Sequence, residues 1–224
     1  MGGVGSAVAL VSVFPMMGLN FTIAKTLALF INTTSMISTS YMNFKRGVLD
    51  FKLALPLVIS LLISAPIGAI LSQGVDQNLL KKLLAIMLIV SATLLLFKVK
   101  ESKVTYTKKW VLFVIGFVVG LISGLLGVGG GILIMPILII LGFDAKKAAY
   151  IVSFIIPFST FGSFVTYLQF IQLDYILLAV VSIAAIIGGY LGGRIMHYNL
   201  SQAQVKKLIA IVLYIIAGKI LLVA

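Results

Sequence analysis

Long apolar runs separated by short polar segments set the pattern of this 224-residue chain. Several runs reach about 18 residues or more, the length that an α-helix needs to cross the ~30 Å hydrocarbon core of a bilayer. The pattern therefore predicts an all-α, polytopic membrane protein. The predicted helices span residues 22–44, 48–71, 78–97, 146–170, 173–197 and 204–224.

A glycine cluster interrupts one apolar stretch near the middle of the chain. The sequence GLLGVGGGILIMP covers residues 124–136, with apolar segments at 110–126 and 132–141 on its two sides. A single helix through both segments would be roughly 48 Å long at ~1.5 Å per residue, which exceeds the hydrocarbon thickness. Because glycine weakens helices, we expect a break here. The second half-helix would then point its positive dipole end, with uncovered N–H groups, at an anion.

The chain also repeats itself after a shift of 124 positions. The repeat predicts a first membrane unit at 1–97, a charged linker at 98–109 and a second membrane unit at 110–224. Each unit is expected to contain one glycine-broken element, re-entrant or crossing, and three transmembrane helices. Two copies of one unit are typical of transporters. Equivalent residues include Gly3 and Gly127, Gly18 and Gly142, Ser35 and Ser159, and Asp50 and Asp174.

The first copy lacks the apolar segment that should precede Gly3, the counterpart of residues 110–126. A free N-terminal ammonium at membrane depth would be costly. We therefore expect that the chain has lost an N-terminal segment, although a protein that dispenses with this segment is the alternative.

The charge distribution matches a membrane setting. The chain is 62% hydrophobic and carries a net charge of +12, from 17 basic and 5 acidic residues. Such an excess can indicate nucleic acid. Here the basic residues lie in pairs at the ends of apolar runs, which indicates interfacial anchors, so the expected partner is the lipid bilayer and not nucleic acid. The absence of cysteine excludes disulfides, thiolate metal sites and cysteine catalysis.

Basic residues also bear on topology. If each broken element crosses fully, the two copies are parallel and the basic residues divide evenly between the two sides. If it dips in and returns, the copies are inverted, and outside the terminal helix only Lys25, Lys81 and Lys82 lie on one side. The positive-inside rule favours inverted copies in the plasma membrane with a cytoplasmic linker. The length of 110–126, which almost spans the core alone, argues against this arrangement.

Hydroxyls and one amide are the polar side chains expected inside the membrane. Such groups usually bond their own backbone or a neighbouring helix. The pairs Ser35 with Thr39 and Ser159 with Ser163 are each four residues apart and share a helix face. Pro157 removes a backbone donor and frees a carbonyl, so it and Pro136 are predicted helix breaks. The candidate substrate-binding residues are Gly3, Gly5, Ser6, Asn32, Ser35, Thr39, Gly127, Gly129, Gly130, Gly131, Ser159 and Ser163.

A neutral, donor-rich pocket of this kind suits a small oxyanion. A metal ion would require carboxylates, and all five acidic residues lie at predicted helix ends or in loops, so neither a metal site nor another cofactor is expected. No nucleophile, base and orienting acid come together, so we do not expect an enzyme. Asp50 and Asp174 are interpreted as helix caps, with a role in ion coupling as the alternative. His197 is interpreted as an interfacial residue, with a titrating gate as the alternative.

Small residues elsewhere have a simpler interpretation. Segments 64–69 and 188–193 occupy equivalent positions in the two copies and are rich in serine, alanine and glycine. Such faces allow close helix packing in membranes.

Several motifs together resemble the sulfite exporter TauE/SafE family. They are the GVGGG break with its following proline at 127–136, the helix from Ala24-Lys25-Thr26-Leu27 through Asn32-Thr33-Thr34-Ser35 to Tyr41, the turn KRGVLDF at 45–51, and the tandem repeat. The resemblance implies a carrier that exports sulfite or small organosulfonates. The sequence departs from the pattern in its missing first segment and in QFIQ at 169–172, where the first copy has KRGV. A passive anion channel and a membrane enzyme or other non-transport subunit are the alternatives, and homo-oligomerisation stays open.

Overall fold

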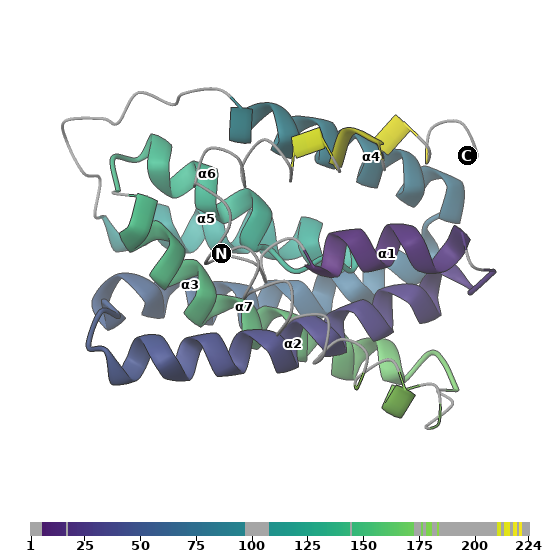
Figure 1. Cartoon of the computed structure of the whole chain (residues 1–224), viewed down its shortest axis with the longest axis horizontal. Coiled ribbons are helices and arrows are strands. Elements are labelled where there is room, and N and C mark those ends of the chain that lie inside the picture. Colours follow the sequence, from purple (N-terminus) through teal and green to yellow (C-terminus); the bar gives the residue numbers. More distant parts are fainter. Residues whose placement is uncertain are drawn as a thin grey trace.

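Helices form the part of the chain that the computed structural model describes. That part covers residues 6–16, 18–96, 108–143 and 145–172, with shorter stretches at 176, 178–180, 183, 210–211, 213–215, 217–218 and 220. No strand occurs within it. The described elements in chain order are α1 Ser6–Met16, α2 Phe21–Lys45, α3 Phe51–Leu71, the 3-10 turn η1 Ser72–Gly74, α4 Gln77–Leu96, α5 Lys109–Leu126, α6 Gly131–Ile140 and α7 Ala145–Leu168 (Figure 1).

Four of the described helices are long and apolar enough to cross a membrane. They cover Phe51–Gly74, Gln77–Leu94, Lys109–Leu126 and Lys147–Leu168. The prediction of an all-α membrane protein with several spanning helices is thereby confirmed. The longest helix, α2, is not among the four, and its sequence carries a polar stretch, Asn32-Thr33-Thr34-Ser35, at its centre.

The α3 and α5 helices pack closely because small residues face each other. A Cβ atom added at Gly116 would meet the Ser60 hydroxyl, and one added at Gly120 would meet the Ser64 hydroxyl. One turn further, a Cβ atom at Gly124 would strike the backbone of α3. Residue numbers rise together in these contacts, so α3 and α5 run in the same direction. The expectation of a small packing face at 64–69 agrees with this interface.

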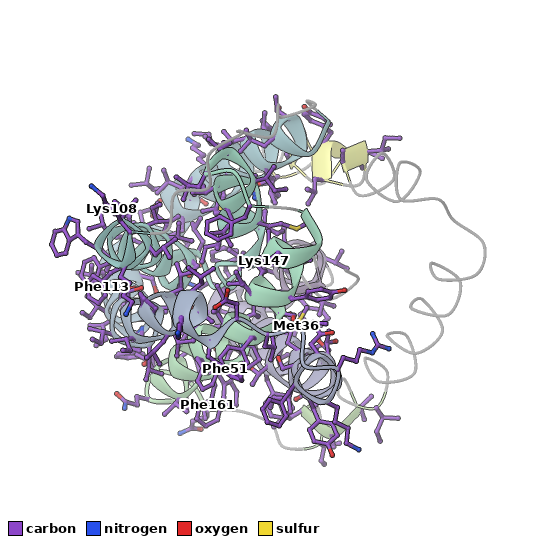
Figure 2. All side chains as sticks on the ribbon, turned by 90° about the vertical axis from the view of Figure 1, so that its left-hand side faces the viewer. Met36, Phe51, Lys108, Phe113, Lys147 and Phe161 are labelled. Carbon is purple, nitrogen blue, oxygen red and sulfur yellow. The ribbon has the colours of Figure 1, made fainter. Side chains whose placement is uncertain are left out.

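The α7 helix runs parallel to α3 and antiparallel to α2. In the first half of α7, the Phe154 ring lies 5.4 Å from the Phe51 ring, and near the end of α7 the Tyr167 hydroxyl lies 2.9 Å from the Ser72 hydroxyl. Contacts with α2 run the other way, because Ser153 bonds Asn43 whereas Tyr167 faces Lys25. Figure 2 looks along these helices from the left-hand side of Figure 1.

The glycine-broken element is a hairpin. Since α5 and α7 run in the same direction, the short α6 between them has to run back. At its start, a Cβ atom added to Gly130 would lie 3.1 Å from Val119 of α5. Just beyond its end, Phe143 shares a hydrophobic cluster with Leu112, near the beginning of α5. We call residues 127–130, between the two helices, the hairpin tip.

The predicted helix boundaries agree with the structure to within about three residues in the first copy and in 110–170. Other predictions fall outside the described residues. These are the helix at 173–197 apart from residues 176, 178–180 and 183, most of the helix at 204–224, the small face at 188–193, and the residues Gly3, Gly5, Glu101, Asp144, Asp174 and His197.

Candidate functional site

The hairpin tip depends on two glycines with left-handed backbone. Gly127 ends α5 with φ +70°, and Gly129 follows with φ +69°. The N–H groups of Gly127 and Val128 both donate to the carbonyl oxygen of Ser123, at 2.8 and 3.1 Å. This closes the C-terminal end of α5, and glycine is favoured there because side chains with a Cβ atom disfavour positive φ. The predicted break therefore lies where the sequence places it.

The N-terminus of α6 is buried and carries no side-chain cap. Gly130 is its N-cap residue and makes no side-chain hydrogen bond. Both Gly130 and Gly131 are buried, and a Cβ atom on Gly131 would lie 3.1 Å from a methyl group of Val152. The first N–H groups of a helix lack intrahelical acceptors, and the helix dipole gives this end a partial positive charge. Such an end favours a negatively charged group.

Two polar residues of the neighbouring helices contact the tip at Gly129. A Cβ atom added at Gly129 would lie 2.6 Å from the methyl carbon of Thr160 on α7 and 3.0 Å from Nδ2 of Asn32 on α2. Asn32 and Thr160 are both buried. The hydroxyl oxygens of Thr33 and Thr160, 2.7 Å apart, link α2 to α7 beside the tip. Of the candidate residues, the structure thus brings Asn32 together with Gly129, and it adds Thr160.

The two predicted hydroxyl pairs differ in environment. Ser159 and Ser163 are each 1% exposed on α7, and Ser159 Oγ has no partner among the described residues. Ser35 is exposed and donates to the carbonyl oxygen of Asn32 at 3.1 Å, while half-buried Thr39 donates to that of Ser35 at 3.4 Å. The Ser35 and Thr39 hydroxyls thus bond the backbone of α2. Ser6 begins α1, but its side chain is not described.

Neither candidate proline ends a helix. Helix α6 continues through Pro136 and α7 continues through Pro157, so the prediction of helix breaks at these residues is wrong. The missing N–H of Pro157 should leave the carbonyl of Ser153, four residues earlier, without its helical donor. The hydroxyl of Ser40 on α2 donates to that oxygen at 2.6 Å. This bond explains how α7 continues through the proline.

One basic residue beside the tip was missed. Lys25 is 1% exposed, although the topology expected from the sequence has it outside the membrane as an interfacial charge. Its methylene carbons lie 2.5 to 2.7 Å from the position of a Cβ atom added to Gly127. Its amine donates to Ser72 Oγ at 3.3 Å and lies 4.7 Å from the centre of the Tyr167 ring. Lys25 precedes Asn32 by seven residues, or about two helical turns, so the spacing alone could have placed both on one face.

Asp50 stands at the N-cap position of α3, where the sequence places a cap. Its carboxylate also pairs with the Lys147 amine of α7 at 2.9 Å. The hydrogen bond from Lys147 lowers the pKa of Asp50 below its usual value, and the carboxyl is close enough to the backbone N–H groups of Leu53 and Lys52 for them to help lower it. The pair lines an open cleft of about 700 Å³ that also contains Lys52 and Tyr150. This cleft lies at the opposite end of α7 from Tyr167, away from the tip.

Comparisons with known proteins show the family of the chain. The model of the sulfite exporter TauE/SafE family matches residues 1–220. A probable membrane transporter protein of Methanocaldococcus jannaschii is 31% identical over 155 residues, which cover 67% of this chain and 57% of that protein. One of Bacillus subtilis is 26% identical over 232 residues, covering 99% of this chain and 92% of that protein. No solved structure matches the chain significantly. The chain therefore belongs to the sulfite exporter TauE/SafE family of membrane proteins.

Proposed function

We propose that this membrane transporter exports small sulfur oxyanions or organosulfonates, such as sulfite, across the plasma membrane. The observation that carries the proposal is the uncapped N-terminus of α6, buried at the hairpin tip between α2 and α7. The family name suggests the substrate class, and both relatives bear the name of probable membrane transporters.

The chemistry of the tip suits such an anion. An oxyanion that leaves water needs replacement donors for its oxygens. Backbone N–H groups of α6, the Asn32 amide and the Ser159 hydroxyl are buried donors on the three helices that meet here. Both described carboxylates have partners of their own, because Asp50 pairs with Lys147 and Asp76 accepts from the backbone N–H groups of Asn78 and Leu79. The donors that the described part of the site offers are uncharged.

Inverted repeats are part of the proposal. Helices α2 and α7 occupy equivalent positions in the two copies, and they pack antiparallel. The turns that precede them have matching glycines, Gly18 with φ +89° and Gly142 with φ +87°. Helix α1 corresponds likewise to α6 in length and position. Gly3, Gly5 and Ser6 are the sequence equivalents of Gly127, Gly129 and Gly130, so the proposed substrate contacts include them.

Accessibility of introduced cysteines tests the inverted arrangement. The chain has no cysteine, so Lys147→Cys and Lys103→Cys each give a single reactive thiol. With inverted copies, both thiols react with a membrane-impermeant maleimide from the cytoplasmic side. Reaction from opposite sides would contradict the inverted arrangement.

Exchange in liposomes tests the transport function. Purified protein is reconstituted into vesicles that contain labelled sulfite, and its release is followed against external sulfite, sulfate, thiosulfate and a small sulfonate. We expect saturable exchange that prefers sulfite or the sulfonate. Flux that rises linearly with concentration would favour a passive anion channel, and no flux of any of the four would favour a non-transport membrane subunit.

A further inference from the structure

The described groups around the buried Lys25 amine are aromatic rings and an uncharged hydroxyl. Two aromatic rings flank it, with their centres 5.1 Å away at Phe21 and 4.7 Å away at Tyr167. Ser72 Oγ is its hydrogen-bond acceptor, at a long 3.3 Å. Among the described residues, the salt bridge found is that of Asp50 with Lys147, so no described carboxylate pairs with Lys25.

The end of α5 does not need the charge of Lys25. Cations often stabilise the last carbonyl groups of a helix. Here Tyr167 donates its hydroxyl to the carbonyl oxygen of Gly124 at 2.7 Å, and the oxygen of Ser123 accepts from Gly127 and Val128. Helix capping therefore does not explain why a lysine is buried at this position.

A buried positive charge without a negative partner costs several kcal/mol. An amine in this setting therefore favours an anion beside it, and the hairpin tip lies directly against its methylene carbons at Gly127. The dipole of α6 supplies only about half a unit of positive charge. Lys25 adds a full unit of positive charge. It lies on the same face of α2 as Asn32, which contacts the tip at Gly129.

We propose that Lys25 is the cationic partner of the transported anion, so that the site selects small oxyanions with at least one full negative charge. This inference rests on the proposed function and assigns the charge that the neutral donors of the tip do not provide. The Lys25 amine would exchange its long bond to Ser72 for a charge-assisted bond to an anion oxygen. Phe21 and Tyr167 would shield that bond from water.

The test compares Lys25→Met with wild type. Methionine keeps much of the packing against Gly127 and removes the charge, and replacing a buried charge by an apolar side chain is often neutral or stabilising. We expect the ligand-free variant to melt at or above the wild-type temperature. Its KM for sulfite exchange should rise by about tenfold to a hundredfold, as expected for one lost charge-assisted hydrogen bond. The rise in melting temperature that added sulfite gives wild type should disappear.

Three further variants complete the design. Lys25→Gln repeats the neutralisation if the methionine variant does not fold, and Lys25→Arg, which keeps the charge, should retain sulfite-dependent stabilisation. Lys82→Met removes an exposed charge near the start of α4 and should leave the KM unchanged. If wild type exchanges sulfite and the neutral variants keep its KM within about twofold, a change of only ~0.4 kcal/mol, Lys25 is not the partner. If wild type neither exchanges sulfite nor is stabilised by it, the result contradicts the proposed function as well.

Discussion

The hydroxyl of Ser40 on α2 bonds the carbonyl oxygen of Ser153 on α7, the oxygen that Pro157 deprives of its helical donor. A second bond joins the same helices close by, from Asn43 Nδ2 to the Ser153 hydroxyl at 2.9 Å. The proline and the serine thus belong to different copies of the proposed repeat and depend on each other.

Replacing Ser40 by alanine should therefore destabilise the protein. The carbonyl of Ser153 would be left without a donor, which costs about 1–3 kcal/mol. Thermal unfolding in detergent measures the loss. In a Pro157→Ala background the restored N–H can bond the same carbonyl, so Ser40→Ala should cost much less there. Equal costs in both backgrounds would show that the carbonyl does not depend on Ser40.

Gly129→Ala should remove most sulfite exchange while the protein stays folded. The new Cβ atom would lie 2.6 Å from the Thr160 methyl carbon in a backbone with φ +69°. The left-handed conformation alone costs about 1–2 kcal/mol of stability. Displacement of the tip by the Thr160 contact should weaken anion binding by at least ~1.4 kcal/mol, which corresponds to about a tenfold loss of exchange in liposomes.

Two variants separate the causes of that loss. Gly47→Ala introduces the same strain at φ +65° with no atom within 4 Å of the new Cβ, so it should keep its exchange activity. Adding Thr160→Ser to Gly129→Ala removes the clashing methyl group and should restore part of the exchange. Full exchange activity of Gly129→Ala alone would show that the hairpin tip is not part of the anion-binding site.

Gly68→Ala should lower stability and not act on the site directly. Its Cβ atom would meet backbone atoms of α5, including the amide nitrogen of Leu125 at 2.8 Å, and backbone cannot rotate away. Overpacking of this kind costs about 1–3 kcal/mol. The melting temperature in detergent should fall accordingly. Gly74→Ala, with no atom within 4 Å of its new Cβ, is the matched control and should melt like wild type.

The pair of Asp50 and Lys147 should give a small, pH-dependent contribution to stability. Because the pKa of Asp50 is lowered in the folded protein, the contribution is complete above the unfolded pKa of about 3.9 and is lost as pH falls through the folded value. Both side chains are partly exposed, so we expect only about 0.2–1 kcal/mol. Asp50→Asn should therefore melt slightly below wild type at pH 7, and the difference should shrink as the pH falls through the folded pKa of Asp50. A difference that persists in acid would have another cause.

The sequence predicts the described helices well because apolar length and glycine act locally. The expected segment 110–126 is observed as Lys109–Leu126, and the segment 132–141 as Gly131–Ile140. The prolines mislead because local chemistry alone suggests a break at Pro157. Whether a helix passes a proline depends on a donor from another helix, here Ser40, which lies 117 positions away in the sequence.

The candidate site could be predicted only in part for the same reason. The glycines of the tip follow from their own backbone requirements, and Asn32 follows from its polarity within an apolar region. The contact of Thr160 with Gly129 and the burial of Lys25 depend on how α2 and α7 cross the tip. A single sequence shows which face a residue occupies but not which helix covers that face.

The glycine contacts between α3 and α5 have a consequence for assembly. In the sequence, α3 precedes the segment 98–107 and α5 follows it. Helix α7, which also follows this segment, packs on α3 and α2 as well. Two halves of the chain, separated within that segment and produced together in one cell, should therefore recognise each other and co-purify. The peptide bonds between them would then serve mainly to deliver both halves in equal number.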